Sequence, residues 1–170
     1  MYWFTAARCL KPQRGSASLY NPSRDYQTGL VIKPESLLAT LTCIGTADAF
    51  NAGGRGHSCY WVEDQLGHYM VDFGPTALLR CLSFNFEPDD LDGVYITHMH
   101  GDHIGGLVSL MAYLAYRRKR RRPLVLSGPP GLQNSVTHLW ESAYPSILRR
   151  GLCFPVIFKV LDVPGVSQVM

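Results

Sequence analysis

The sequence predicts an α/β domain in which helices pack on a mixed β-sheet. Apolar runs rich in β-branched and aromatic residues alternate with segments whose leucines recur every three or four residues. Turn sequences rich in Gly, Pro and Asp separate these runs. A chain of 170 residues with 46% hydrophobic residues is long and apolar enough for one domain with a real core. The expected order, β, β-hairpin, α, β, α, β, α, β, fits a layered α/β architecture.

The first part of the predicted domain consists of strands. It begins near Leu37, with a strand over residues 38–44 and then a loop, 45–56, that holds four glycines. Two further strands are expected at 58–63 and 68–73. They flank the turn Asp64-Gln65-Leu66-Gly67, which predicts a β-hairpin.

Helices and strands alternate in the remainder of the chain. Pro75 suits the first turn of a helix, and an acidic turn over residues 88–93 leads into a short strand at 94–96. Apolar side chains then recur at helical spacing at Leu107, Leu110, Met111 and Leu114. The expected strand 124–126 precedes another amphipathic helix, marked by Leu132, Val136, Leu139 and Trp140. A final strand is predicted over 154–161.

The whole chain is organised around residues 93–106, where three of the six histidines and one aspartate lie close together. If the strand geometry continues to His100, His98 and His100 project to the same side. Asp102 and His103 follow at the start of the next helix. Nitrogen and oxygen ligands converging in this way suit zinc, manganese or iron. The alternative is that Asp102 only caps the helix.

Three glycines in this stretch predict local backbone geometry. Gly101 is expected to let the chain turn tightly between the histidines and the helix. Gly105 and Gly106 are poor helix formers at the start of an amphipathic helix. Their presence predicts that the backbone passes close to the histidine cluster or to a neighbouring strand.

The segment Thr97-His98-Met99-His100-Gly101-Asp102-His103 matches the His-x-His-x-Asp-His signature of the metallo-β-lactamase superfamily. The chain resembles this superfamily from about Leu37 to its end. It is most similar to the ribonuclease Z and related phosphodiesterase branch. Three further stretches carry that similarity: Gly45-Thr46-Ala47, Asp72-Phe73-Gly74 and Ser127-Gly128-Pro129-Pro130-Gly131-Leu132. The resemblance implies the N-terminal half of a four-layer αββα sandwich, with the site at one edge between the two sheets.

The resemblance also implies the chemistry of a metal-dependent hydrolase. Two divalent ions, zinc in the first place and manganese or iron otherwise, would be held by His98 and His100 and by Asp102 and His103. Asp102 would thereby take part in catalysis, and water between the ions would become the nucleophile. The preferred substrate is a phosphodiester such as RNA. The alternatives are an ester, thioester or lactone substrate, or a non-catalytic metal- or nucleic-acid-binding remnant.

Other polar residues are candidates for supporting roles. The resemblance implies that Asp72 orients the metal-binding loop by accepting a hydrogen bond from an imidazole, whereas a turn aspartate bonding its own backbone is the alternative. The glycine-rich stretch 53–58 brings Arg55 and His57 toward an anionic substrate or forms a surface loop. His138 lies in the middle of a helix and is expected at the surface.

The positive charge of the chain is concentrated in residues 117–122, Arg-Arg-Lys-Arg-Arg-Arg. Removing these six charges changes the formal net charge from +3 to −3. The run is interpreted either as a solvated helix end or as a region that attracts a phosphate backbone. No aromatic residues are interleaved with it, so base stacking is not predicted.

Cysteine usage and hydropathy bear on the compartment. Five widely spaced cysteines argue against a disulfide framework and favour a reducing compartment, the cytoplasm. No apolar run reaches the length of a membrane span. Residues 1–36 are interpreted as a disordered extension or as an organelle-targeting segment, and we favour the extension, which leaves residues 37–170 as the domain.

The chain is expected to be catalytically incomplete by itself. The superfamily takes a third histidine for the first metal, a bridging acidic residue and a further histidine from the part of the fold after the motif. Here His138 is the one histidine after His103, and Asp162 is the one acidic residue after Glu141. We therefore expect weak metal binding and negligible hydrolysis from residues 1–170 alone. An open sheet would favour association, of which a homodimer is one form.

Overall fold

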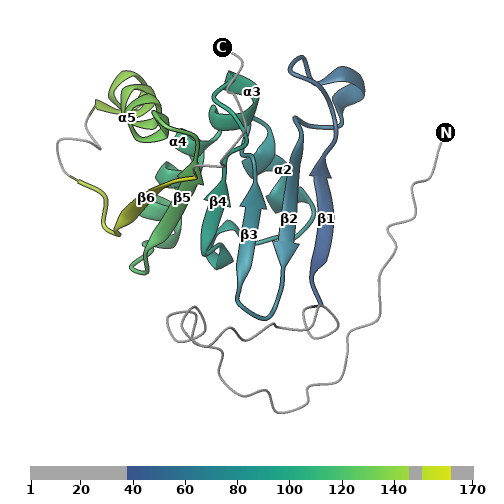
Figure 1. Ribbon diagram of the computed structural model, residues 1–170, viewed down its shortest axis with the longest axis horizontal. Helices are drawn as coiled ribbons and strands as arrows, with labels where there is room; N and C mark the ends of the chain where they lie inside the picture. The colour runs from purple at the N-terminus through teal and green to yellow at the C-terminus, as the bar shows by residue number, and fades with distance from the viewer. Residues whose placement is uncertain (1–37, 146–150, 162–170) are drawn as a thin grey trace. The chain divides into compact units, whose positions relative to one another are not determined.

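The computed structural model describes residues 38–145 and 151–161, and in them a six-stranded sheet follows chain order, β1-β2-β3-β4-β5-β6 (Figure 1). The strands are β1 (Thr40–Gly45), β2 (Cys59–Glu63), β3 (His68–Val71), β4 (Gly93–Tyr95), β5 (Leu124–Gly128) and β6 (Val156–Val160). β1, β2 and β3 pair antiparallel, and β3 to β6 pair parallel. The predicted α/β class and the predicted hairpin are confirmed.

Helices connect the parallel strands. They are α2 (Ala77–Ser83), α3 (Gly101–Ile104), α4 (Leu107–Ala112), which continues into a π-helical turn η4 (Tyr113–Arg118), and α5 (Leu132–Ala143). Two short 3-10 turns are η2 (Ala52–Gly54) and η3 (Pro88–Asp90). Each crossover moves one strand further in the same direction, so right-handed connections place the helices on one face of the sheet. Figure 1 shows α2 and α4 behind the sheet. In the described residues, no helix is long and apolar enough to cross a membrane.

The two faces of the sheet differ in burial. The face toward the helices forms the core, where Trp61, Met70 and Leu126 pack with the apolar side of α4. Strand register aligns a second apolar row on the opposite face: Leu41, Val62, Tyr69, Val125 and Ile157. Leu41 is 61% exposed and Ile157 is 41% exposed. Because successive side chains of a strand point to opposite faces, the sheet has one buried face and one partly exposed apolar face.

The carboxyl ends of the parallel strands meet at one edge of the sheet. Val71 at the end of β3 pairs with Tyr95 of β4, and Tyr95 pairs with Ser127 of β5. The segments that follow these strands therefore lie beside one another. They are residues 72–76, the histidine motif and the turn before α5.

The motif strand β4 begins and ends one residue earlier than the predicted 94–96, and a hydrogen bond to Asp72 follows its end. β4 ends at Tyr95, although the N–H of Ile96 still donates to the carbonyl of Ser127. The next N–H, that of Thr97, donates to Asp72 Oδ1 at 2.8 Å. A side chain thus replaces the neighbouring strand as the acceptor. The regular strand does not continue to His100, yet His98 Nε2 and His100 Nδ1 still lie 3.2 Å apart. Residues 1–36 and Asp162 lie outside the described residues, so the predictions made for them stay predictions.

Candidate metal centre

The four motif side chains converge at the sheet edge, carried by a loop and a short helix. His98 lies in the loop after β4, and His100 is the N-cap residue of α3, with an extended backbone. Asp102 and His103 lie within α3. His98 Nε2 is 3.2 Å from His100 Nδ1, and the His98 and His103 ring centroids are 3.9 Å apart. Because His100 occupies the cap position, the alternative that Asp102 is the N-cap was wrong.

Asp72 connects the loop and the helix of the motif through hydrogen bonds to Thr97 and His103. It is buried and has a left-handed backbone, φ 60°, which few residues other than Gly, Asn and Asp adopt readily. Its carboxylate accepts hydrogen bonds from the Thr97 N–H, the Thr97 hydroxyl and, at 2.7 Å, the His103 ring. A carboxylate only accepts, so His103 donates from Nδ1. These are the contacts that the expected orienting role of Asp72 requires.

Two glycines allow the motif helix to pack directly on the segment after β3. Phe73 N–H donates to the His103 carbonyl, and Gly106 N–H donates to the Phe73 carbonyl. A Cβ on Gly106 would lie 2.0 Å from the Gly74 carbonyl oxygen, and a Cβ on Gly74 would lie 1.9 Å from the Asp102 carbonyl oxygen. The predicted close backbone approach is confirmed at Gly106. Gly101 has open space around it and no positive φ, so the tight-turn explanation for Gly101 was wrong.

His103 has a carboxylate at each ring nitrogen. Nδ1 is 2.7 Å from Asp72 Oδ2, and Nε2 is 3.1 Å from Asp102 Oδ2. A neutral imidazole carries one N–H, so in that form its second nitrogen would present a lone pair to a carboxylate oxygen. A cation between Nε2 and Asp102, either a proton or a metal ion, removes this conflict.

His98 is biased toward its neutral form, which is the form that ligates metals. Partial burial lowers its pKa, and the positive charges that His103 and His100 can carry lower it further, against the opposing effect of Asp72 and Asp102. Protons compete with metals for imidazole nitrogens. A lowered pKa therefore leaves the nitrogen of His98 available to a metal at lower pH.

The spacing of the donor atoms bears on whether a metal fits. In the described part of the chain, no three His, Cys, Asp or Glu side chains are grouped to hold an ion. The pairs are nevertheless spaced as two ligands of one ion: His98 Nε2 to His100 Nδ1 is 3.2 Å, and His103 Nε2 to Asp102 Oδ2 is 3.1 Å. Two ligands of a tetrahedral zinc lie about 3.3 Å apart. The residues present therefore fit one pair of ligands at each of two positions.

The remaining candidate residues lie in different environments. His57 is buried, with 8% of its surface exposed, and its N–H and ring Nδ1 both contact the Thr76 hydroxyl, at 2.8 and 3.0 Å. It therefore anchors the end of its loop, and the surface-loop interpretation was wrong for this residue. Arg55 and His138 are exposed, and the latter agrees with the prediction.

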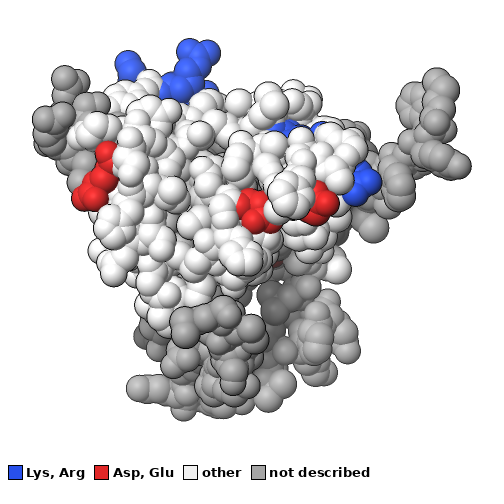
Figure 2. Space-filling view, turned by 90° about the horizontal axis from the view of Figure 1, so that it is seen from above, with Lys and Arg blue, Asp and Glu red and all other residues white. Residues whose placement is uncertain are grey.

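Three of the six residues of the basic run form ion pairs with acidic residues that precede β4. Arg118 pairs with Glu87, Arg120 with Asp89 and Arg122 with Asp92. Arg120 is buried, and its guanidinium also donates to the carbonyls of residues 89, 91, 122 and 123. Arg120 is therefore not part of a solvated or phosphate-binding run. The other five residues of the run are exposed, and both interpretations stay predictions for them. Figure 2, which looks onto the molecule from above, shows Lys and Arg mainly at the margins of a mostly uncharged surface.

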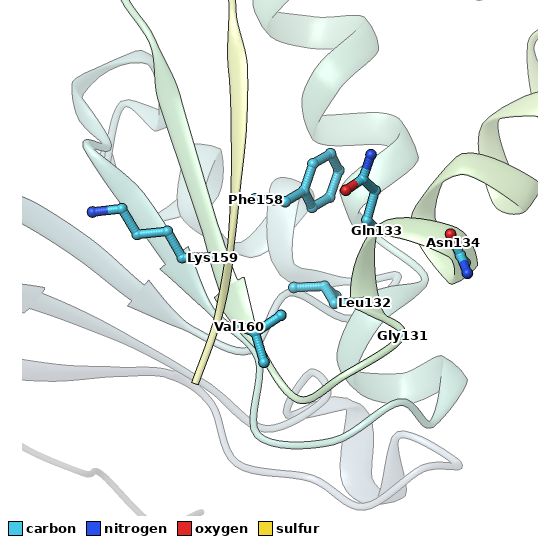
Figure 3. A pocket seen from close by; sticks show the side chains of 7 residues that line it. All are labelled: Gly131, Leu132, Gln133, Asn134, Phe158, Lys159 and Val160. Atoms are coloured by element: carbon cyan, nitrogen blue, oxygen red, sulfur yellow. The ribbon is translucent and has the colours of Figure 1, made fainter. Parts of the chain in front are cut away.

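A separate pocket of about 230 Å³ lies between the end of β6 and the start of α5 (Figure 3). Leu132 and Asn134 line it from α5, and Phe158 and Val160 line it from β6. Lys159 extends away from the α5 side chains. No motif residue lines this pocket, so its chemistry is independent of the histidine cluster.

Solved structures share this fold. Human tRNase Z, short form, matches with a TM-score of 0.60 and 22% identity, covering 74% of this chain and 46% of that chain. The metallo-β-lactamase fold protein YhfI from Bacillus subtilis matches with a TM-score of 0.52 and 18% identity, covering 73% and 46%. At these identities the matches establish the fold.

Sequence relatives lead to the same branch. Ribonuclease Z from Methanococcus aeolicus is 27% identical over 104 residues, which are 61% of this chain and 32% of the relative. Ribonuclease Z from Brevibacillus brevis is 35% identical over 75 residues, which are 44% of this chain and 24% of the relative. The chain thus spans a quarter to a third of the length of these relatives.

The fold, the motif and these relatives define a metallo-β-lactamase-fold protein of the ribonuclease Z-like branch, which is a branch of enzymes. A family model described as "Anti-Pycsar protein Apyc1" matches residues 39–152, more than half of the chain, and the chain belongs to that family. The predicted superfamily, branch and enzyme class are confirmed.

Sequence reasoning missed one contributor to the site, Thr97, and one buried cation at the amino ends of β4 and β5, Arg120. Thr97 lies between Asp72 and His98 and contacts both. Its position directly before the first histidine was the available signal. Arg120 was treated as one of a charge run, although an acidic turn and a basic run each precede a strand of the same parallel pair, β4 and β5. That arrangement brings the two segments together.

Proposed function

We propose that this chain contributes metal ligands to the active site of a metal-dependent phosphodiesterase, with RNA as the substrate class. His98 and His100 bind one divalent ion, Asp102 and His103 bind a second, and zinc is the expected metal. The placement of His103 between two carboxylates carries the proposal, because a divalent ion held by Nε2 and the Asp102 carboxylate would satisfy both groups. His98 and His100 are exposed at the sheet edge, which leaves that side of the cluster accessible to a large substrate.

The residues of this chain act by holding and orienting groups. When bound, divalent ions supply Lewis acidity and lower the pKa of water. Asp72 fixes the His103 ring by accepting the Nδ1–H, which directs Nε2 toward Asp102. Asp102 is the proposed catalytic residue, because its carboxylate lies at the cluster and directly beside His103. Gly74 and Gly106 keep α3 against the segment that carries Asp72.

The substrate class rests on relatives named ribonuclease Z and on the fold shared with human tRNase Z. Arg55, exposed on its loop, is the proposed phosphate contact, and His57 supports that loop from beneath. Three members of the basic run form no ion pair among the described side chains and remain for RNA: Arg117, Lys119 and Arg121. The activity of the whole protein belongs to this proposal.

Metal content tests the site. Wild-type protein, His98→Ala and His103→Ala are purified with zinc, and bound metal is measured by atomic emission. The two substitutions should lower zinc content sharply, because each leaves an incomplete ligand set. His138→Ala, an exposed histidine outside the cluster, is the control and should retain wild-type zinc. Equal zinc in all four proteins would refute the metal centre.

Two model substrates test the reaction class. Any zinc-dependent turnover is expected on bis(p-nitrophenyl) phosphate and to be absent from p-nitrophenyl acetate. His103→Ala, assayed beside the wild type, separates turnover at the cluster from turnover by free metal. Zinc-dependent hydrolysis of the acetate alone would place the chain among carboxylester hydrolases.

A further inference from the structure

Thr97 joins the buried carboxylate of Asp72 to the first histidine of the motif. Its hydroxyl oxygen is 2.8 Å from Asp72 Oδ2, 3.0 Å from Asp72 Oδ1 and 3.0 Å from His98 Nδ1. Its backbone N–H donates separately to Asp72 Oδ1 at 2.8 Å. One side chain therefore contacts both an acceptor-only group and an imidazole nitrogen.

Counting hydrogens determines the direction of each bond. A hydroxyl has one hydrogen to donate, and a carboxylate can only accept. The Thr97 hydrogen therefore goes to Asp72, and the hydroxyl oxygen is left to accept from His98. His98 must then carry its proton on Nδ1, which leaves the lone pair of the neutral ring on Nε2. Nε2 is the nitrogen that faces His100, at 3.2 Å.

We propose that Thr97 is a positioning residue that fixes the tautomer of His98, holding the proton on Nδ1 and presenting the Nε2 lone pair at the histidine cluster. The consequence for zinc rests on the proposed function, whereas the tautomer itself does not. Partners of metal-binding histidines set the tautomer and the ring orientation in this way. Through Asp72, the same hydroxyl also links His98 to His103.

Two substitutions separate the hydroxyl from the rest of the residue. Thr97→Val keeps the β-branched shape and the backbone N–H bond to Asp72 but removes the hydroxyl. Thr97→Ser keeps the hydroxyl and removes only a methyl group. Thr42→Val, on β1 and without a contact to the motif, is the control for loss of a threonine hydroxyl elsewhere in the sheet.

The tautomer is measured directly by long-range ¹H–¹⁵N NMR of the histidine rings in zinc-free protein at neutral pH. Wild type, Thr97→Ser and Thr42→Val should show the His98 proton on Nδ1. Thr97→Val should show the proton on Nε2 or a mixture of both tautomers. Zinc affinity, measured by competition with a fluorescent chelator, should fall about 10- to 100-fold in Thr97→Val and stay near wild type in the other two.

The outcomes distinguish this inference from the proposed function. A wild-type His98 protonated on Nε2, or an unchanged tautomer in Thr97→Val, would overturn the role of Thr97 whatever the zinc affinity. A wild type that binds no zinc but carries the His98 proton on Nδ1 would overturn the metal centre and leave the role of Thr97 standing. If Thr97→Val does not fold, the tautomer of His98 in the wild type still tests the proposal.

Discussion

Burial separates the described cysteines into two chemical kinds. Cys59 and Cys81 lie in the core, and burial raises the pKa of each thiol to about 12. Cys43 and Cys153 are exposed. The thiolate is the reactive form, and a raised pKa keeps a thiol protonated and inert at pH 8.

Alkylation at pH 8 should therefore label Cys43 and Cys153 and spare Cys59 and Cys81. Native protein is treated with iodoacetamide and the labelled sites are found by peptide mass spectrometry. Urea-unfolded protein is the control, in which all five cysteines of the chain are labelled. Because the folded pKa is raised, the contribution of both buried thiols to stability is complete below about pH 8.5, the usual pKa of cysteine, and declines as the pH rises toward 12. Labelling of Cys59 in folded protein at the rate of Cys43 would contradict this expectation.

At the scale of elements, Arg120 connects the segment before β5 to the turn before β4. Its buried guanidinium donates hydrogen bonds to Asp89 and to four backbone carbonyls, including those of Leu91 and Pro123. These carbonyls flank the strands that carry the motif and the turn before α5. The ion pair with Asp89 is partly exposed, so the hydrogen bonds to the carbonyls matter more than the charge.

Arg120→Met should lower the free energy of unfolding by about 2–4 kcal/mol, because buried carbonyls lose their donors. Urea titration followed by tryptophan fluorescence measures the change. Arg117→Met, an exposed arginine of the same run, is the matched control and should stay within about 0.5 kcal/mol of wild type. Equal changes in the free energy of unfolding for the two substitutions would show that Arg120 acts only as a solvated charge.

The packing of α3 and α4 on the segment after β3 depends on one glycine more than on another. Gly106→Ala should destabilise the protein by about 1–3 kcal/mol, because its Cβ would meet backbone that cannot move aside easily. Gly101→Ala, in open space within α3, should be neutral or slightly stabilising. Thermal unfolding of both variants beside wild type measures the difference. A destabilised Gly101→Ala with a tolerated Gly106→Ala would reverse the assignment.

At the scale of the whole molecule, we propose that residues 37–170 form the domain and that residues 1–36 are dispensable for it. The proposal rests on the composition of those residues, which are rich in Ser, Pro and Gly and poor in apolar periodicity. A chain beginning at Ser36 should melt within about 1 °C of the full chain, because the proposal assigns no core residue to the part removed. A loss of about 1 kcal/mol would shift melting by several degrees. Differential scanning fluorimetry measures both. A drop of several degrees would show that residues 1–36 stabilise the domain.

Most elements were predictable because strand and helix periodicity is local. The hairpin, β5 and the apolar side of α4 followed from residues adjacent in sequence. The end of β4 could not be predicted locally, because the Thr97 N–H that follows it bonds the Asp72 side chain, 25 residues away. The ion pairs of the basic run could not be predicted locally either, because Arg120 and Asp89, for example, lie 31 residues apart.

The sequence by itself determined the superfamily, the fold class and the composition of the histidine cluster, because the motif lies within a few consecutive residues of a strand-to-helix connection. Only the tertiary structure decided how these side chains are held. The carboxylate of Asp72 reaches His103 across 31 residues of chain, and Thr97 contacts both Asp72 and His98. Hydrogen-bond direction depends on which donors and acceptors meet in space. Parallel pairing of β3 and β4 brings these groups to one edge, where the meeting occurs.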